Sequence, residues 1–153
     1  MTKSMIPRIP KALVAEHEEL HAELVKLTLR RGKVGEAART VATLLHPHFV
    51  KEEEFALPPL GLLTELAEGR VKPEMQDVLP MIDKLRAELP QMLAEHTIIV
   101  GALRRLAAAA KQEKKPEAAR FAEALKLHAL SEEQILYPAA LLVGECIRAR
   151  MGR

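Results

Sequence analysis

Histidine and glutamate recur in this sequence at one fixed spacing. Glu52 follows His48 by four positions, and Glu132 follows His128 by the same interval. On an α-helix, residues four positions apart lie one above the other, so each pair can direct an imidazole nitrogen and a carboxylate toward one place. Nitrogen and oxygen ligands without sulfur suit iron or manganese, with zinc as a further candidate. The spacing therefore predicts a metal site built from two helices.

Both pairs belong to an internal repeat of about half the chain. Each pair begins a motif that ends in proline, at residues 48–58 and 128–138. A second motif, Ala-Glu-His preceded by an apolar residue, ends at His17 and recurs with nearly the same offset at His96. A shared offset across separate motifs indicates a duplicated unit. We therefore expect two copies of one helical hairpin, each of which adds a further histidine to the site.

Four segments carry apolar residues at intervals of three and four, the pattern of a helix with one buried face. Prolines at first helical positions and glycine-containing turns mark the ends of these segments. In chain order, we expect a helix from Pro10, a turn at Arg30–Gly35, a helix to Pro58, a connection with a short helical piece up to Gly69, a helix from Pro73 to Ala110, a helix from Pro116 and a short tail helix after Pro138.

The connections between these helices indicate how the helices pack. Short turns after the first and third helices place neighbouring helices antiparallel. No segment alternates apolar and polar residues as a strand does. The sequence therefore predicts an all-α, antiparallel up-and-down four-helix bundle with a pseudo-two-fold internal repeat and a short extra C-terminal helix. We interpret residues 1–153 as one domain with its core at residues 10–140.

Three prolines fall within the predicted helices. A proline inside a helix removes one backbone hydrogen bond and clashes with the carbonyl group four residues back. We therefore expect a kink or a restart near His46, just before Pro47, and breaks at Pro80 and Pro90.

Six ionisable residues stand on the buried stripes, where a plain bundle would have leucine or isoleucine. Burying such groups without partners costs several kcal/mol each, so a shared metal is expected. We predict that Phe55 and Ile135 also lie on these buried stripes. Glu53 and Glu133 should point roughly 100° further round, outside the ligand set or toward solvent. The predicted metal ligands are His17, His48, Glu52, His96, His128 and Glu132.

Composition limits the other kinds of partner. The net charge is +2, from 23 Lys and Arg against 21 Asp and Glu, and the basic residues are not interleaved with aromatic ones. No apolar run reaches the roughly 18 residues of a membrane span, and the amino-terminal segment does not resemble a signal peptide. Cys146 is the only cysteine, which excludes a disulfide or a thiolate-held cluster within the chain. We expect a cytoplasmic protein that binds neither nucleic acid nor membrane, and no feature indicates its oligomeric state.

These motifs resemble those of the hemerythrin-like family, also called HHE cation-binding domains. The resemblance covers about residues 10–140 and rests on His17, the motif at 48–58, His96 and the motif at 128–138. It implies a four-helix bundle around a non-haem centre of two iron ions, bridged by the two glutamates and by an oxo or hydroxo group. It also implies a small ligand, either oxygen, nitric oxide or hydrogen peroxide, and a role in redox chemistry or iron homeostasis.

One position departs from the oxygen-carrying members of that family. They have a second histidine one turn after the third-helix histidine, where this chain has Val100, and the equivalent place on the first helix holds His21. His21 is therefore a candidate fifth histidine ligand, or a histidine that supports the ligands from outside. In this interpretation His17 and His48 hold one iron, and the other two histidines hold the second. We favour the four-histidine site, which leaves an open position on both ions.

Two other interpretations are open at this point. The stretch from His17 to His21 matches the His-Glu-x-x-His pattern of zinc metalloproteases, with Glu18 as the general base of a metal-dependent hydrolase. Such enzymes also need a sheet and a third ligand, which this pattern does not supply. The second alternative is a metal-free helical interaction module, which would be colourless and unaffected by chelators.

Overall fold

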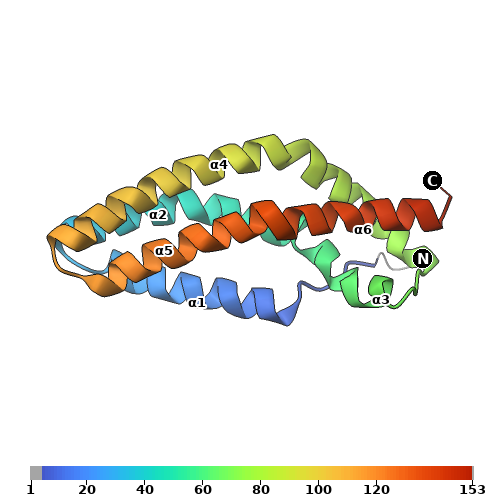
Figure 1. The fold of residues 1–153 in the computed structure, drawn as a ribbon, viewed down its shortest axis with the longest axis horizontal. Coiled ribbons are helices and arrows are strands. Elements are labelled where there is room, and N and C mark those ends of the chain that lie inside the picture. The colour runs from blue at the N-terminus through green and yellow to red at the C-terminus, as the bar shows by residue number, and fades with distance from the viewer. Residues whose placement is uncertain (1–4, 153) are drawn as a thin grey trace.

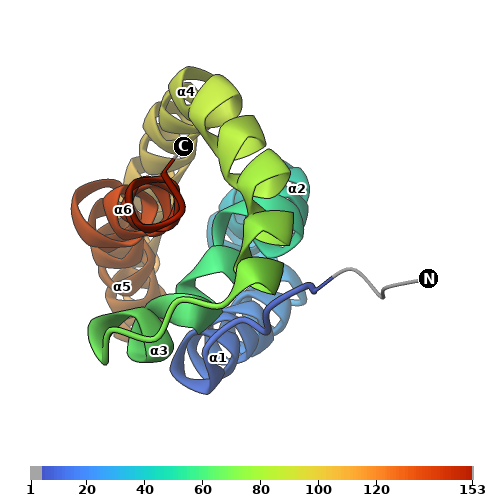
Figure 2. The same cartoon turned by 90° about the vertical axis from the view of Figure 1, so that its right-hand side faces the viewer.

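The computed structural model describes residues 5–152, which form helices joined by short turns (Figure 1). Its four bundle helices are α1 (Lys11–Thr28), α2 (Gly32–Lys51), α4 (Leu79–Gln112) and α5 (Pro116–Ser131). Viewed along the long axis, these helices surround a common centre, with α1 packed on α5 and α2 packed on α4 (Figure 2). No strand occurs among residues 5–152, and the all-α four-helix bundle is confirmed.

A π-helical turn follows each histidine of the repeated motif. Helix α2 passes into the π-helix η1 (Glu52–Ala56), and α5 passes through the π-helix η4 (Glu132–Leu136) into α6 (Tyr137–Arg150). The backbone N–H of Leu57 donates to the carbonyl of Glu52 at 2.8 Å, an i+5 bond that accommodates one extra residue in the turn. The predicted tail helix is therefore the continuation of the fourth bundle helix.

The extra residue changes which side chains face inward after the second glutamate. Ile135, which we expected on the buried stripe, is 62% exposed, and Tyr137 is buried instead. An α-helical count from Glu132 leads to Ile135 and Leu136, whereas the π turn brings the fifth residue onto the same face. The prediction for Ile135 is therefore wrong, while Phe55, the equivalent residue of the first copy, is buried as predicted although it too lies in a π turn.

The two halves of the repeat end differently. After η1 the chain leaves the bundle through η2 (Pro58–Leu62), α3 (Leu63–Ala67) and η3 (Pro73–Val78), which includes the short helical piece predicted before Gly69. After η4 the chain continues straight along α6 (Figure 1). Helix α6 packs on η2 and η3 through an apolar cluster that includes Leu62, Met75, Ile82, Val143 and Ile147.

The prolines do not divide the helices. Helix α2 is continuous through Pro47, and α4 is continuous through Pro90, although α4 is visibly arched (Figure 1). Pro80 lies in the first turn of α4, where a missing N–H leaves no bond unmade. Both Pro47 and Pro90 are exposed, so a carbonyl group freed by the proline can bond to water. The expected restart near His46 and the expected break at Pro90 are therefore wrong, whereas the helix predicted from Pro73 does change from the 3-10 helix η3 to α4 just before Pro80.

Gly35 was also expected in a turn, yet it lies within α2. A Cβ atom at this position would come within 1.8 Å of the carbonyl oxygen of Arg30. Glycine is needed here because the turn after α1 approaches the first turn of α2 closely, and no change of backbone conformation is involved. The turn itself is shorter than predicted, since α2 begins at Gly32.

The apolar core consists of layers on either side of a polar layer. One layer, toward the α1–α2 turn, includes Leu24, Val41, Leu103 and Phe121. The next, toward α6, includes Phe55, Leu85, Met92 and Tyr137. A fully buried leucine or phenylalanine side chain stabilises the fold by about 1.5–3 kcal/mol. These layers therefore stabilise the four helices and hold the polar residues between them.

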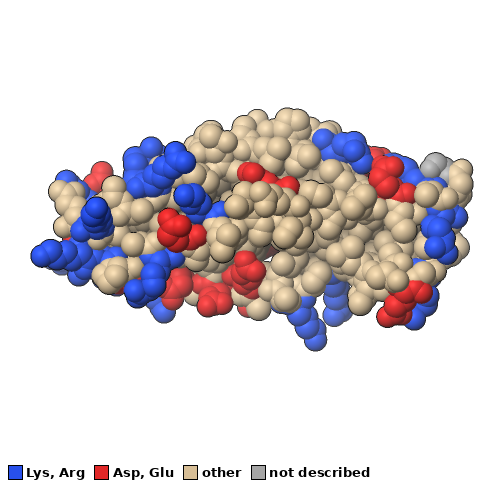
Figure 3. Space-filling view, in the orientation of Figure 1, with Lys and Arg blue, Asp and Glu red and all other residues tan. Residues whose placement is uncertain are grey.

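On the face shown in Figure 3, Lys and Arg are concentrated toward the two ends, several Asp and Glu lie between them, and a broad area of the middle carries no charge. None of the helices between residues 5 and 152 combines the length and the apolar composition that a membrane crossing requires.

Candidate metal centre

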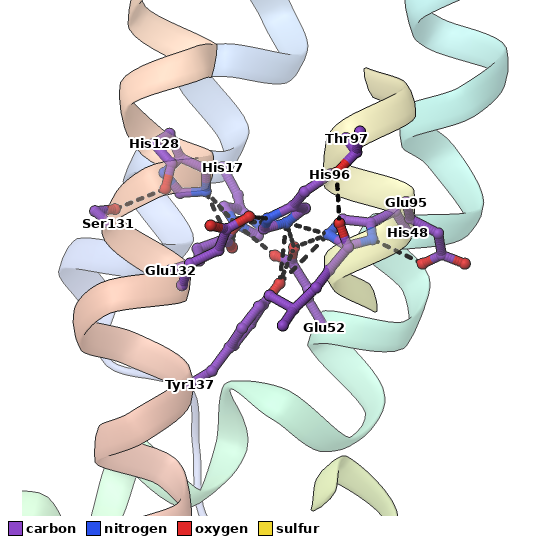
Figure 4. A network of polar contacts seen from close by, with 12 residues as sticks. His17, His48, Glu52, Glu95, His96, Thr97, His128, Ser131, Glu132 and Tyr137 are labelled. Atoms are coloured by element: carbon purple, nitrogen blue, oxygen red, sulfur yellow. Dashed lines mark hydrogen bonds and ion pairs between the residues drawn. The ribbon is translucent and has the colours of Figure 1, made fainter. Parts of the chain in front are cut away.

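Six ionisable side chains converge at the centre of the bundle (Figure 4). Each of the four bundle helices contributes a histidine, and the two π turns contribute the glutamates. All six are buried, and they are the predicted ligands His17, His48, Glu52, His96, His128 and Glu132. The structure thus brings together residues that lie on four helices and in both halves of the repeat.

The histidines form two pairs, and each pair joins one half of the repeat to the other. The Nε2 atoms of His17 and His128 are 3.1 Å apart, and those of His48 and His96 are 2.8 Å apart. We expected His17 to share an ion with His48, whereas the potential ligand atoms group His17 with His128 and His48 with His96.

Both glutamates belong to both pairs. Glu52 places Oε1 2.6 Å from His48 Nε2 and Oε2 3.3 Å from His17 Nε2. Glu132 places Oε1 3.3 Å from His96 Nε2 and Oε2 3.2 Å from His128 Nε2. Two groups of four ligand atoms result, each with two histidines and both glutamates, and within each group the atoms lie within 4.8 Å of one another. One carboxylate oxygen in each group is the arrangement in which a carboxylate can bridge two cations.

The polar atoms of this layer are not satisfied by one another. Oε2 of Glu52 and Oε2 of Glu132 are buried and have no hydrogen-bond partner, although a histidine nitrogen lies near each. Unpaired buried carboxylate oxygens are costly, and metal ions are partners that would satisfy them. The nitrogen and oxygen donors, the shared carboxylates and the unpaired oxygens therefore fit cation binding.

The pKa values reflect the close packing of opposite charges. Burial alone would lower the pKa of His17 and of His96, but the carboxylates of Glu132 and Glu52 close to each ring raise both to about 10. Burial alone would raise the pKa of Glu52, but hydrogen bonds from the side chains around it hold that pKa well below its usual value. Without a cation, the carboxylates therefore hold protons on the histidines, and a cation would have to replace those protons.

Three glutamates outside the ligand set orient the histidines. Nδ1 of His48 donates to Glu95 at 2.9 Å, Nδ1 of His96 donates to Glu133 at 2.9 Å, and Nδ1 of His128 donates to Glu16. Such bonds direct the Nε2 atom of each ring toward the cluster and raise its basicity. Glu133 lies where we predicted, just outside the ligands, while Glu53 is exposed.

The sequence analysis did not assign a role to Glu16 or Glu95. Each is the glutamate of the repeated Ala-Glu-His motif, so the repeat could have indicated a role for both. Each one reaches a histidine of the other half of the chain. This contact could be inferred only once the neighbouring helices were known.

His17 has a different environment from the other three histidines. Its ring stacks on Phe49 with 4.3 Å between ring centres and 11° between planes. Among residues 5–152, no side chain or backbone group accepts a hydrogen bond from its Nδ1. The repeat places Ala129 where Phe49 stands in the first copy.

Tyr137 is a further site residue that the sequence analysis missed. Its hydroxyl group donates to Glu52 Oε1 at 3.0 Å and lies 3.3 Å from Nε2 of both His48 and His96 (Figure 4). Burial, followed by the charges of Glu52 and Glu132, raises the pKa of Tyr137, so the phenol stays neutral. The corresponding residue in the first copy of the repeat is Leu57.

His21 lies outside both ligand groups and is exposed. It borders a surface pocket of about 460 Å³ that also reaches His17 and Phe49. Because His17 points into the bundle and His21 toward solvent, the pair does not form the zinc site that the His-Glu-x-x-His pattern would require. The complete lining is Ile9, Leu13, Val14, His17, Glu18, His21, His46, Phe49, Val50, Glu53 and Leu57.

Residues 5–140 match the model of the hemerythrin HHE cation-binding domain. The chain belongs to this family. The matched range contains all six buried candidate ligands and both π turns of this chain. No curated protein and no solved structure gives a significant match to the chain. Together, the HHE family and the two buried ligand groups indicate that this domain binds cations.

Proposed function

We propose that the protein is a non-haem di-iron protein that binds or reacts with oxygen, nitric oxide or hydrogen peroxide, in redox chemistry or iron homeostasis. The observation that carries this proposal is the pair of four-ligand groups that share Glu52 and Glu132. Each carboxylate has one oxygen in each group, so two cations could be bridged without moving a helix. The proposed ligands of the two ions are the six buried residues.

The donor set favours iron. Two histidine nitrogens and two carboxylate oxygens per ion, without sulfur, suit iron or manganese better than copper(I) or an iron–sulfur cluster, and zinc is a further candidate. When bound, a pair of irons would supply the changes of oxidation state that the chemistry of oxygen, peroxide or nitric oxide requires. Four protein ligands per ion would not complete the coordination of either ion.

The chain prepares this site in three ways. The glutamates that accept from Nδ1 of His48, His96 and His128 hold those rings with Nε2 directed inward. The apolar layers above and below exclude water, which strengthens electrostatic interactions in the site. The Tyr137 hydroxyl holds Glu52 Oε1 in place. We therefore propose that the ligands are positioned before a cation arrives.

Iron content measured together with an absorption spectrum tests this proposal. Protein produced with added iron and purified without oxygen should contain two irons per chain, and its spectrum should change when oxygen, nitric oxide or peroxide is added. Elemental analysis that finds well under one metal per chain would contradict the proposal and favour the metal-free interaction module. Two ions of another metal per chain would support the proposed site and change only the identity of the metal.

A further inference from the structure

An exposed apolar ridge runs along the continuous helix formed by α5, η4 and α6. Four large apolar side chains on its outer side are each between 44% and 67% exposed. They are Leu127, Leu130, Ile135 and Leu142. Once the extra residue of the π turn is discounted, they follow one another at intervals of three, four and seven helical positions. Such intervals place all four on one side of a helix, opposite its buried residues.

No free charge interrupts this ridge. Residues 127–144 include only four ionisable side chains, although 29% of the chain is charged. His128, Glu132 and Tyr137 are buried, and Glu133 accepts a hydrogen bond from His96. Helices α5 and α6 cross the face shown in Figure 3, where the middle of the molecule is broadly uncharged. A continuous apolar patch of this kind on a soluble protein marks an interaction surface.

A groove lies beside the ridge, between α4 and α5. Its volume is about 230 Å³, and Val100, Leu127 and Leu130 line it, together with Glu123, Lys126, Ala129 and Glu133. An interface between two identical copies related by a two-fold axis must be self-complementary. A ridge next to a groove meets this requirement, because the ridge of each copy can pack along the groove of the other.

The surface area is sufficient for such an interface. The chain exposes 9152 Å², whereas a compact monomer of 17.0 kDa exposes about 7,700 Å². A stable interface of standard size buries about 800 Å² on each partner. The pairing of two copies would therefore leave each chain with a surface close to that of a compact protein.

The ridge has nearly the same residues in both directions from Ile135. Leu127 lies eight positions before Ile135, and Leu142 lies seven positions after it. In an antiparallel pair, positions equally far before and after the two-fold axis meet. With the axis beside Ile135, each Leu127 therefore meets Leu142 of the other copy, and Ile135 meets its own counterpart.

The charges that flank the ridge are complementary in the same register. Lys126 stands nine positions before Ile135, and Glu145 stands ten positions after it. Both lie on the α4 side of the ridge, since Lys126 lines the groove and Glu145 pairs with Arg86 of α4 at 3.1 Å. A two-fold rotation keeps them on one side, so each Lys126 would face Glu145 of the other copy. Opposite charges in register favour a second copy of this chain over an unrelated protein.

We propose that a second copy of this chain covers the ridge, in an antiparallel pair whose two-fold axis passes beside Ile135. The apolar side chains form the centre of the interface, and the Lys126–Glu145 pairs lie at its edge. This inference needs no metal in the bundle, so it is independent of the proposed function.

Sedimentation of the metal-free protein and of the iron-loaded protein tests the pairing. In micromolar solution the wild type should have twice the mass of one chain. Ile135→Asp should reduce the mass to that of one chain, because two carboxylates would meet at the axis. Leu142→Asp lies farther from the buried centre and should act in the same way if Ile135→Asp folds poorly. Val25→Asp, at an exposed position of α1 outside the ridge, is the matched control and should remain paired.

Two outcomes of sedimentation would overturn the proposal. A wild type with the mass of one chain would leave the ridge to a different protein. Pairing that persists in both Ile135→Asp and Leu142→Asp would place the interface elsewhere on the molecule. Circular dichroism of each variant shows whether it is folded.

Charge reversal tests the register. Lys126→Glu places like charges opposite each other and should weaken the pair at least about tenfold, and Glu145→Lys should do the same. The double variant exchanges the two charges, so it should recover most of the affinity. Losses that simply add in the double variant would overturn the antiparallel register.

Cross-linking tests the position of the axis. A residue beside a two-fold axis faces its own counterpart, within the short distance that a disulfide needs. In a Cys146→Ser background, Ile135→Cys treated with oxidised glutathione should therefore give chains linked in pairs. Val25→Cys in the same background should remain as single chains under denaturing electrophoresis. Equal yields of linked chains from the two variants would overturn the placement of the axis.

Discussion

The His17 side and the His96 side of the centre have the same kinds of ligand but different surroundings. His96 donates through Nδ1 to Glu133 and has Tyr137 against its ring, whereas His17 stacks on Phe49 and borders a pocket. The repeat would place Glu53 beside His17, but Glu53 is exposed. A duplicated hairpin thus preserves the six candidate ligands, while the neighbouring side chains differ, with a buried phenol on the His96 side and a surface pocket on the His17 side.

The largest expected effect comes from the residues that both sides share. Glu52→Ala or Glu132→Ala removes one oxygen from each ligand group, so either change should reduce iron from two per chain to below one. Glu54→Ala, an exposed neighbour in the same π turn, is the control and should retain both irons. Elemental analysis, with circular dichroism to confirm folding, measures the outcome. Full iron content in either variant would show that the carboxylate is not shared.

A smaller effect should separate the two sides. Glu133→Ala removes the acceptor of His96 Nδ1, and loss of such a partner typically weakens metal affinity by about 10- to 100-fold. Glu53 holds the same place in the other copy, and its side chain is exposed. Glu53→Ala should therefore leave the metal affinity unchanged. Competition against a chelator measures both variants. Similar losses in the two variants would mean that the halves become equivalent once metal is bound.

The metal-free protein should lose stability as pH rises. The pKa of His17 and of His96 is raised to about 10 in the folded protein, above the usual value of 6.5. Their stabilising contribution is therefore complete below about pH 6.5 and is lost as pH rises through about 10. Urea unfolding of the metal-free protein between pH 6 and 10 measures this. A double variant, His17→Gln with His96→Gln, should show a flatter dependence, and an equally steep one would assign the loss to other groups.

The loaded protein should respond to pH in the opposite direction. Histidine must be neutral at Nε2 to bind a metal, so acid should release iron while moderate alkali should not. Absorption spectra between pH 8 and pH 4 would record the release. A spectrum that persists in strong acid would indicate that carboxylates, and not the histidines, dominate the ligation.

The sequence allowed the six buried candidate ligands to be predicted as one cluster, because their chemistry and their helical spacing agree. His48 with Glu52, and His128 with Glu132, stand four positions apart on apolar stripes, and the structure buries all four together. The pairing of His17 with His128 was not predictable in the same way. Spacing along the chain locates a residue on its helix, but it does not indicate which helix is the neighbour.

The π turns mark a second limit. An extra residue in a helical turn leaves no clear sign in the pattern of apolar residues, so Ile135 was placed inward and Tyr137 was overlooked. The π turn brings Glu132 and Tyr137, which are five positions apart, onto one face of the helix. Leu57 likewise could not be interpreted until Tyr137, its counterpart in the second copy, was seen beside the histidines.

The smallest effect is expected for His21, which lies beside the surface pocket on the His17 side of the centre. His21 is exposed at the pocket and lies outside both ligand groups, so His21→Leu should retain two irons and the absorption spectrum of the wild type. Leucine also keeps the helix, because it has a high helix propensity. Iron analysis and titration of the reduced protein with oxygen provide the test. Loss of a stable oxygenated spectrum at normal iron content would identify His21 as a fifth histidine ligand. The ion on the His17 side would then have more protein ligands than the ion on the His96 side.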